Sequence, residues 1–133
     1  MSETLIILKA DALERGLVGK IISRFEEKGL SIEHICTKVG SKNMWEEHYA
    51  EHREKPFFSD LVVSMTDKKV ICISLRGPND HTIDLVRAMV GESEPLKRLP
   101  GTIRFDFSCE RRKNVIHASD SKAAFEHEKL IWL

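Results

Sequence analysis

His117 is the residue whose neighbours in the sequence point most directly to chemistry. It follows the apolar pair Val115–Ile116 and directly precedes the polar segment Ala118–Ser121. An unperturbed imidazole has a pKa of about 6.5 and is largely neutral at pH 7, so one ring nitrogen is free to act as a nucleophile. A strand end that leads into a helix N-terminus also favours bound anions. These local features leave two readings open, a reactive histidine or a core histidine beside an ordinary helix cap.

Two further motifs match known patterns only in part. Gly16–Lys20 resembles a phosphate-binding loop, but it has two residues between its glycines where that loop needs four, and Ile21 where it needs Ser or Thr. His48–His52 has the spelling H-x-x-E-H, in which two histidines on one helix face can bind zinc. A catalytic zinc site also needs a third ligand and a cleft, so a solvated helix face is the favoured interpretation.

The apolar periodicity and the turn residues predict alternating strands and helices. The run Thr4–Leu8 predicts a strand buried on both faces, because it is continuously apolar and β-branched. The other expected elements are a helix over about 13–28, a strand over 30–39, short helices after Ser41 and Pro56, a strand over 70–75, a helix capped by Asp80 and closed by Gly91, a loop over 92–102, a strand over 114–117, and a last helix capped by Ser119 or Asp120 that ends near Trp132.

This order predicts an α+β fold in a single domain over residues 1–133. Without the two inserted short helices, it is the split β-α-β-β-α-β pattern of a ferredoxin-like sheet. We expect a four-stranded antiparallel sheet with helices on one face. Because that topology hosts many unrelated activities, it does not name a function.

The composition excludes several broad classes of protein. The 133 residues include 21 Lys+Arg and 21 Asp+Glu, and 41% are hydrophobic, as in a folded globular domain. The zero net charge argues against sequence-blind nucleic-acid binding. No apolar run approaches the roughly 20 residues of a membrane helix, and the first residues lack the basic region of a signal peptide. With three widely spaced cysteines, we expect reduced thiols and a cytoplasmic location.

Several segments together resemble one enzyme family. Asn114–Ser121 is similar to the active-site signature N-x-x-H-[G/A]-S-D of the nucleoside diphosphate kinases. The matching segments follow the order of the family over almost the whole chain: Leu8–Ala12, His48–Tyr49, Pro56–Phe58, Arg87 with Gly91–Ser93, and Pro100–Arg104. Agreement of several motifs in order is far more specific than any one of them.

The resemblance implies transfer of the γ-phosphate of a nucleoside triphosphate to a nucleoside diphosphate, by ping-pong chemistry through a phosphohistidine on His117. It implies broad base specificity, Mg²⁺ carried by the nucleotide phosphates rather than by a protein site, and a homo-oligomer, either a hexamer or a tetramer. The resemblance implies that Glu128 orients the ring of His117 and that Tyr49 supports Lys9 or His117. It implies that the phosphates are bound by Lys9, Arg87, Arg104 and Ser93, the sugar by Asn114, and the base by Phe57 and Leu61.

The chain also departs from the pattern of the family. Ala10 stands where the family has Pro, and Phe105 follows Arg104 where the family usually has Gly. The segment 77–87 is slightly longer than usual, and the chain ends at Leu133, where relatives often carry a tail. A relative that keeps the fold but not the activity, as a scaffold or nucleic-acid-binding module, is the alternative. The complete set of polar site residues and the neutral charge weigh against it.

Overall fold

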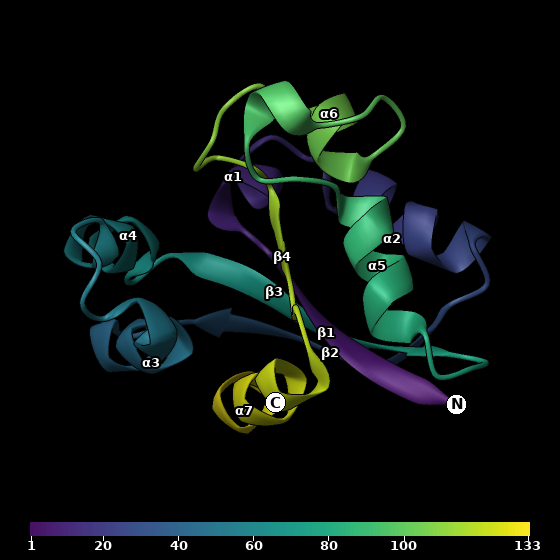
Figure 1. The fold of residues 1–133 in the computed structure, drawn as a ribbon, viewed down its shortest axis with the longest axis horizontal. Coiled ribbons are helices and arrows are strands. Elements are labelled where there is room, and N and C mark those ends of the chain that lie inside the picture. Colours follow the sequence, from purple (N-terminus) through teal and green to yellow (C-terminus); the bar gives the residue numbers. More distant parts are fainter.

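A four-stranded antiparallel sheet forms the centre of the computed structural model, which describes residues 1–133 (Figure 1). The order of the strands is β2-β3-β1-β4, so the last strand of the chain lies at an edge beside the first. This arrangement confirms the predicted ferredoxin-like α+β fold. The strands are β1 (Ser2–Leu8), β2 (Ser31–Val39), β3 (Lys69–Gly77) and β4 (Ile116–Ala118).

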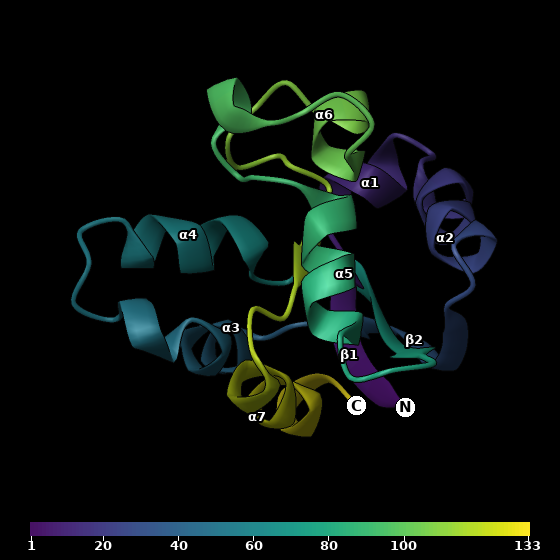
Figure 2. The ribbon, with the colours of Figure 1, turned by 45° about the vertical axis from the view of Figure 1, so that its right-hand side comes forward.

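Helices cover both faces of the sheet, whereas we expected them on one face. The helices are α1 (Ala10–Glu14), α2 (Val18–Glu27), α3 (Lys42–His48), α4 (Phe58–Met65), α5 (Thr82–Val90), α6 (Ile103–Phe107) and α7 (Lys122–Trp132), with 3₁₀ turns at Ala50–His52 and Pro95–Lys97. In Figures 1 and 2, α2 and α5 lie on one side of the sheet, and α3, α4 and α7 lie on the other.

The alternation of side chains along β1 explains the two layers of helices. Ile6 and Leu8 belong to the core under α2 and α5, and Leu5 and Ile7 belong to the core under α3 and α7. All four are fully buried. A strand that is apolar on both faces needs cover on both, so the expectation of helices on one face conflicted with the sequence of β1 itself.

The predicted helix over 13–28 corresponds mainly to α2, and its first two residues belong to a separate helix, α1. Gly16 separates them with a φ of 68°, in the left-handed region that glycine adopts without steric cost. Because α1 begins directly after β1, it fixes Lys9 and Asp11 at the end of the central strand. The partial phosphate-loop motif therefore spans this break and the first turn of α2, with Gly19 and Lys20 exposed.

Ser41 caps α3 as predicted, but the caps of α5 and α7 differ from the predicted ones. The Ser121 hydroxyl accepts a hydrogen bond from the Ala124 N–H at 3.0 Å, so Ser121 caps α7 in place of Ser119 or Asp120. The N-cap residue of α5 is His81, whose side chain makes no cap hydrogen bond, so α5 begins one residue later than a cap at Asp80 predicts. Thr102 caps the unpredicted α6, and β4 begins at Ile116 rather than at residue 114.

The register of β4 decides which way His117 faces. His117 pairs with Ile7 of β1, and directly paired residues share a face of the sheet. Because Ile7 belongs to the core under α3 and α7, the side chain of His117 points toward these two helices. No helix in the structure combines the length and the apolar character that a membrane span needs.

Candidate active site

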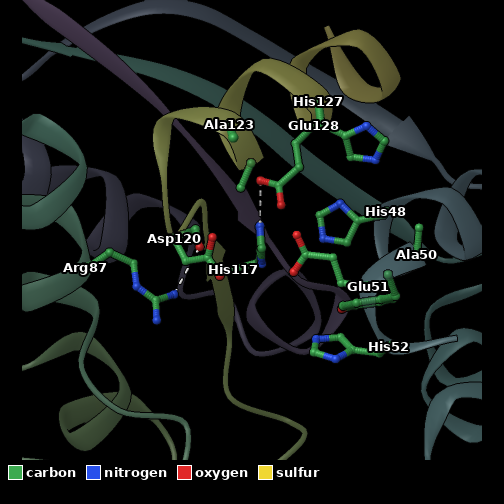
Figure 3. Close-up of a pocket in the computed structure, with 13 residues that line it drawn as sticks. His48, Ala50, Glu51, His52, Arg87, His117, Asp120, Ala123, His127 and Glu128 are labelled. Atoms are coloured by element: carbon green, nitrogen blue, oxygen red, sulfur yellow. Dashed lines mark hydrogen bonds and ion pairs between the residues drawn. The ribbon is translucent and has the colours of Figure 1, made fainter. Parts of the chain in front are cut away.

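The imidazole of His117 is anchored through one of its two nitrogens. Its Nε2 lies 3.0 Å from Glu128 Oε1 (Figure 3). The Ser119 hydroxyl donates to the same oxygen at 2.5 Å. Burial raises the pKa of the Glu128 carboxyl, but the bonds and charge of His117 and the bond from Ser119 hold it below its usual value. The carboxylate is therefore ionised and accepts from Nε2–H, so Nδ1 of the ring carries the free lone pair.

Helix α7 presents Glu128 to this site because of its helical spacing. Phe125, Glu128 and Trp132 are its three buried residues and lie three or four positions apart, on one face of the helix. A buried carboxylate on an otherwise apolar face needs hydrogen-bond partners, and His117 and Ser119 supply them. The resemblance implied the bond to Glu128, but Ser119 was expected only as a possible helix cap.

The backbone before His117 is held in a strained conformation. Val115 has a φ of 68°, a left-handed value that β-branched residues rarely adopt. Its N–H donates to Asp11 Oδ2 at 3.0 Å, and its carbonyl accepts from the Lys9 N–H at 2.9 Å. The end of β1 and the first turn of α1 thus clamp the segment that leads into β4. No sequence signal pointed to Val115 or to this role of Asp11.

Lys9 is a buried cation without a carboxylate partner. Its ammonium donates to the Arg112 carbonyl at 2.8 Å and to Asn114 Oδ1 at 3.1 Å. Burial, together with the charges of Arg104 and Arg112, lowers its pKa to about 8. An ammonium that is held at this cost favours the arrival of an anion.

Arg104 is a second buried cation in the same region. Its guanidinium donates to the Ile116 carbonyl at 2.6 Å and to the Gly91 carbonyl at 3.1 Å, and its Nε has no partner. Burial and the nearby charges of Arg87 and Arg98 lower its pKa to about 10. The buried charges of Lys9 and Arg104 make this part of the molecule positive although the whole chain is neutral.

A cavity of about 510 Å³ brings most of the predicted residues together. Its walls contain eight of them: Lys9, Tyr49, Phe57, Leu61, Ser93, Arg104, Asn114 and His117. Arg111 and Arg112 also line this cavity, and the sequence had assigned neither of them a role. The cavity therefore joins buried cations, the nucleophile candidate and an apolar wall.

Arg87 and Glu128 line a neighbouring cavity of about 280 Å³, which shares His117 and Tyr49 with the first. Figure 3 shows His117 in the middle of this cavity, with Arg87 on one side and His48 on the other. Arg87 donates to the Ala118 carbonyl at 3.2 Å. Tyr49 stacks on Trp45 and makes no hydrogen bond to Lys9 or His117 in this structure.

The H-x-x-E-H motif does not form the zinc site that its spelling allows. The possible ligand atoms of His48, His117 and Glu128 lie within 4.8 Å of one another, and His52 does not belong to this cluster. The indole N–H of Trp132 donates to His48 Nδ1 at 2.9 Å, so the neutral ring carries its proton on Nε2. Burial keeps His48 neutral by lowering its pKa well below the usual value. An N–H at Nε2 does not coordinate a cation, so this donor set does not fit a metal ion.

A ring nitrogen that is left free beside buried, unpaired cations is the arrangement of a phosphate-handling enzyme. Comparison with known proteins defines the family. The family model described as "Nucleoside diphosphate kinase" matches residues 2–133. The chain belongs to the nucleoside diphosphate kinase family.

Individual relatives agree with this membership. The nucleoside diphosphate kinase of Thermoplasma volcanium is 47% identical over 132 residues, which are 99% of this chain and 88% of that protein. That of Corynebacterium diphtheriae is 45% identical over 130 residues, 97% of this chain and 94% of that protein. Among solved structures, the apo enzyme of Encephalitozoon cuniculi has a TM-score of 0.95 at 34% identity and covers all of this chain and 89% of its own.

Proposed function

We propose that this chain transfers the γ-phosphate of a nucleoside triphosphate to a nucleoside diphosphate through a phosphohistidine on His117. Membership of the family supports the activity. The bond between His117 Nε2 and Glu128 supports the mechanism, because it orients the ring and leaves Nδ1 as the nucleophile. This bond is the observation that carries the proposal.

The first half-reaction forms an N–P bond and breaks a P–O bond. The Nδ1 lone pair attacks the γ-phosphorus, the bond to the bridging oxygen breaks, and the nucleoside diphosphate leaves with the electron pair. No proton has to leave His117, since its proton stays on Nε2 against Glu128, which stabilises the positive charge that develops on the ring. In the second half-reaction, a terminal phosphate oxygen of another diphosphate attacks the phosphohistidine, and the imidazole is restored.

The positively charged side chains of the site bind the phosphate groups of the nucleotide. Lys9 acts as a point charge, and the planar guanidiniums of Arg87 and Arg104 bind phosphate oxygens in pairs. Ser93 adds a hydroxyl donor, and Tyr49 supports Lys9 or His117 from the wall that both cavities share. Phosphoryl transfer is catalysed mainly by such positioning and charge stabilisation.

The sugar and the base occupy the rest of the larger cavity. Asn114 bonds the ribose, while Phe57 stacks on the base and Leu61 lines the slot. An aromatic face and an apolar wall contact any base, so the specificity is broad. Mg²⁺ enters with the substrate, as the magnesium complex of the nucleotide. We also propose that the chain works in the cytoplasm. We propose in addition that it forms a homo-oligomer, a hexamer or a tetramer, and light scattering would measure the number of subunits.

Labelling with γ-³²P-ATP in the absence of an acceptor tests the mechanism. We expect an acid-labile, base-stable label that is discharged by added diphosphate. His117→Ala abolishes it, and the matched control His34→Ala, at an exposed histidine of β2, keeps it. A label that persists in His117→Ala refutes the assignment of the nucleophile. A wild-type protein that takes no label, yet binds nucleotide in calorimetry, supports the alternative of an inactive relative.

A further inference from the structure

Two cysteines face each other across neighbouring strands, outside the cavities described above. Cys36 of β2 pairs directly with Cys72 of β3 in the antiparallel register, and directly paired residues share a face of the sheet. Cys72 belongs to the core under α3 and α7, and Cys36 packs against that core. Both are free thiols, and the chemistry proposed above uses neither of them. The register of the strands thus places two oxidisable groups side by side.

The spacing of the two strands suits a disulfide bond. Directly opposed residues of an antiparallel pair have Cα atoms about 4.5–5.5 Å apart. A disulfide bond requires Cα atoms about 4.4–6.8 Å apart. The register shift of β2 lies between Ile32 and His34, so the pairing of Cys36 with Cys72 is regular. The backbone of both strands therefore keeps its place when the bond forms.

The two thiols differ in their access to solvent. Cys72 is fully buried, whereas Cys36 is partly exposed and lies on β2, an edge strand of the sheet. A dissolved oxidant therefore reaches Cys36 first. Burial is the main cause that raises the pKa of Cys72 to about 12, and the neighbouring Cys36 adds to this rise. The Cys72 thiolate is scarce at pH 7, so its reaction with an oxidised Cys36 is the slow step.

Cys36 also contacts the helix that carries Glu128. Its thiol donates to the Trp132 carbonyl at 3.7 Å. This carbonyl lies in the last turn of α7, where carbonyls have no N–H partner within the helix. The indole N–H of Trp132 donates to His48, and the rings of His48 and His117 are 4.5 Å apart. Two intervening residues thus connect Cys36 to the imidazole of His117.

We propose that Cys36 and Cys72 are an oxidation site, at which hydrogen peroxide forms a reversible disulfide bond that slows the formation of phosphohistidine on His117. Formation of the bond turns the sulfur of Cys36 toward Cys72 and removes the S–H donor from the Trp132 carbonyl. The effect on His117 rests on the proposed function, whereas the disulfide bond does not. In a reducing compartment both thiols return to the free form that the structure shows.

The oxidation proceeds in two steps. The Cys36 thiolate attacks one oxygen of the peroxide, the O–O bond breaks, and Cys36 becomes a sulfenic acid. The departing hydroxide takes up the proton that the thiol had released and becomes water. The Cys72 thiolate then attacks the sulfur of Cys36, the S–O bond breaks, and a second water leaves as the S–S bond forms. Two thiols and one peroxide thus give one disulfide and two waters.

Peroxide treatment of a Cys109→Ser protein tests the bond itself. This background removes the exposed cysteine, which is free to form bonds between chains. We expect both remaining thiols to be lost together and to be recovered with dithiothreitol. Mass spectrometry after trypsin should show the peptides of Cys36 and Cys72 joined, two hydrogen atoms lighter than their sum. A protein that keeps both thiols, or that oxidises Cys36 without a link to Cys72, overturns the proposal.

Single substitutions in the same background separate the roles of the two cysteines. In Cys72→Ala the sulfenic acid of Cys36 has no partner, so its dimedone adduct persists. In the parent the adduct disappears as the disulfide forms. In Cys36→Ala the buried Cys72 takes no dimedone under the same treatment. Dimedone on Cys72 of this variant, or an adduct that persists equally in the parent and in Cys72→Ala, contradicts the assigned order.

The rate of single-turnover labelling with γ-³²P-ATP tests the effect on His117. Since the lost contact is one weak hydrogen bond, we expect the oxidised parent to be labelled roughly two- to tenfold more slowly than the reduced parent. Dithiothreitol restores the rate, and Cys36→Ala has the same rate before and after peroxide. An unchanged rate in the fully oxidised parent refutes the link to the active site. If the reduced parent takes no label, the proposed function fails, while the joined peptides still report the disulfide.

Discussion

The buried ammonium of Lys9 predicts that part of the stability of the protein is recovered as the pH rises from 7 to 10. Burial is the main reason why the pKa of Lys9 is about 8 rather than the ordinary 10.5. Between these two values the unfolded chain still holds the proton that the folded chain has released, so stability rises with pH. At 1.36 kcal/mol per pKa unit, the charge costs about 3 kcal/mol at pH 7, and about 2.5 kcal/mol of this cost is gone by pH 10.

Urea unfolding of the wild type and of Lys9→Met at pH 7, 8, 9 and 10 measures this cost. Other lysines and tyrosines titrate in the same range, so the difference between the two proteins is the quantity to follow. We expect this difference to move by about 2–3 kcal/mol in favour of the wild type between pH 7 and 10. Lys20→Met, at an exposed lysine of α2, gives a constant difference. Parallel curves for the wild type and Lys9→Met refute the reasoning.

The same pKa governs activity if the charge of Lys9 binds phosphate. Because kcat/KM reports the free enzyme, it falls above about pH 8, by roughly tenfold per pH unit. The nucleotide stabilises the ammonium, so kcat holds to a higher pH than kcat/KM does. A kcat/KM that stays constant to pH 10 contradicts a phosphate-binding role for the charged form of Lys9.

Three further substitutions test the support of the site. Glu128→Gln removes the charged acceptor of His117 Nε2, a bond of about 1.5–3 kcal/mol, so single-turnover labelling slows about 10–100-fold. Arg98→Met leaves four carbonyls without their donor and lowers the free energy of unfolding in urea by about 2–4 kcal/mol. Ser121→Ala removes the cap of α7 and lowers the free energy of unfolding by about 1 kcal/mol in the same assay. Asp120 does not cap this helix, so Asp120→Ala lowers it by less than about 0.5 kcal/mol.

Each of these predictions has an outcome that contradicts it. A labelling rate of Glu128→Gln within twofold of the wild type would show that the carboxylate does not orient the ring. A loss below about 1 kcal/mol in Arg98→Met would show that water replaces the guanidinium at its carbonyls. Equal losses for Ser121→Ala and Asp120→Ala would remove the distinction between the cap and its neighbour.

The sequence predicted the sheet and most of the helices because their signals are local. The apolar run of β1, the capping serine before α3 and the closing glycine after α5 depend on a few neighbouring residues. The break at Gly16 was missed because the apolar spacing continues across it. The cap of α7 was misplaced because three consecutive residues, Ser119, Asp120 and Ser121, all suit that position.

The site was predicted mainly through the family resemblance, since its residues come from distant segments. The pairing of β1 with β4 brings Lys9 beside Asn114, and no periodicity encodes that contact. The sequence also assigned no role to Arg98, because an isolated arginine in a loop carries no pattern. Its guanidinium donates to four carbonyls that only the fold brings together.

The conformation of Val115 couples activity to complete folding. A valine does not select a φ of 68° by its own preference, so the segment that carries His117 acquires its shape only when Lys9 and Asp11 hold it. These contacts join positions about a hundred residues apart in the chain. If His117 forms the phosphoenzyme as proposed, we therefore expect phosphohistidine formation to return after dilution from denaturant only once the first strand has docked against the last, so that catalytic competence reports the closure of the whole domain.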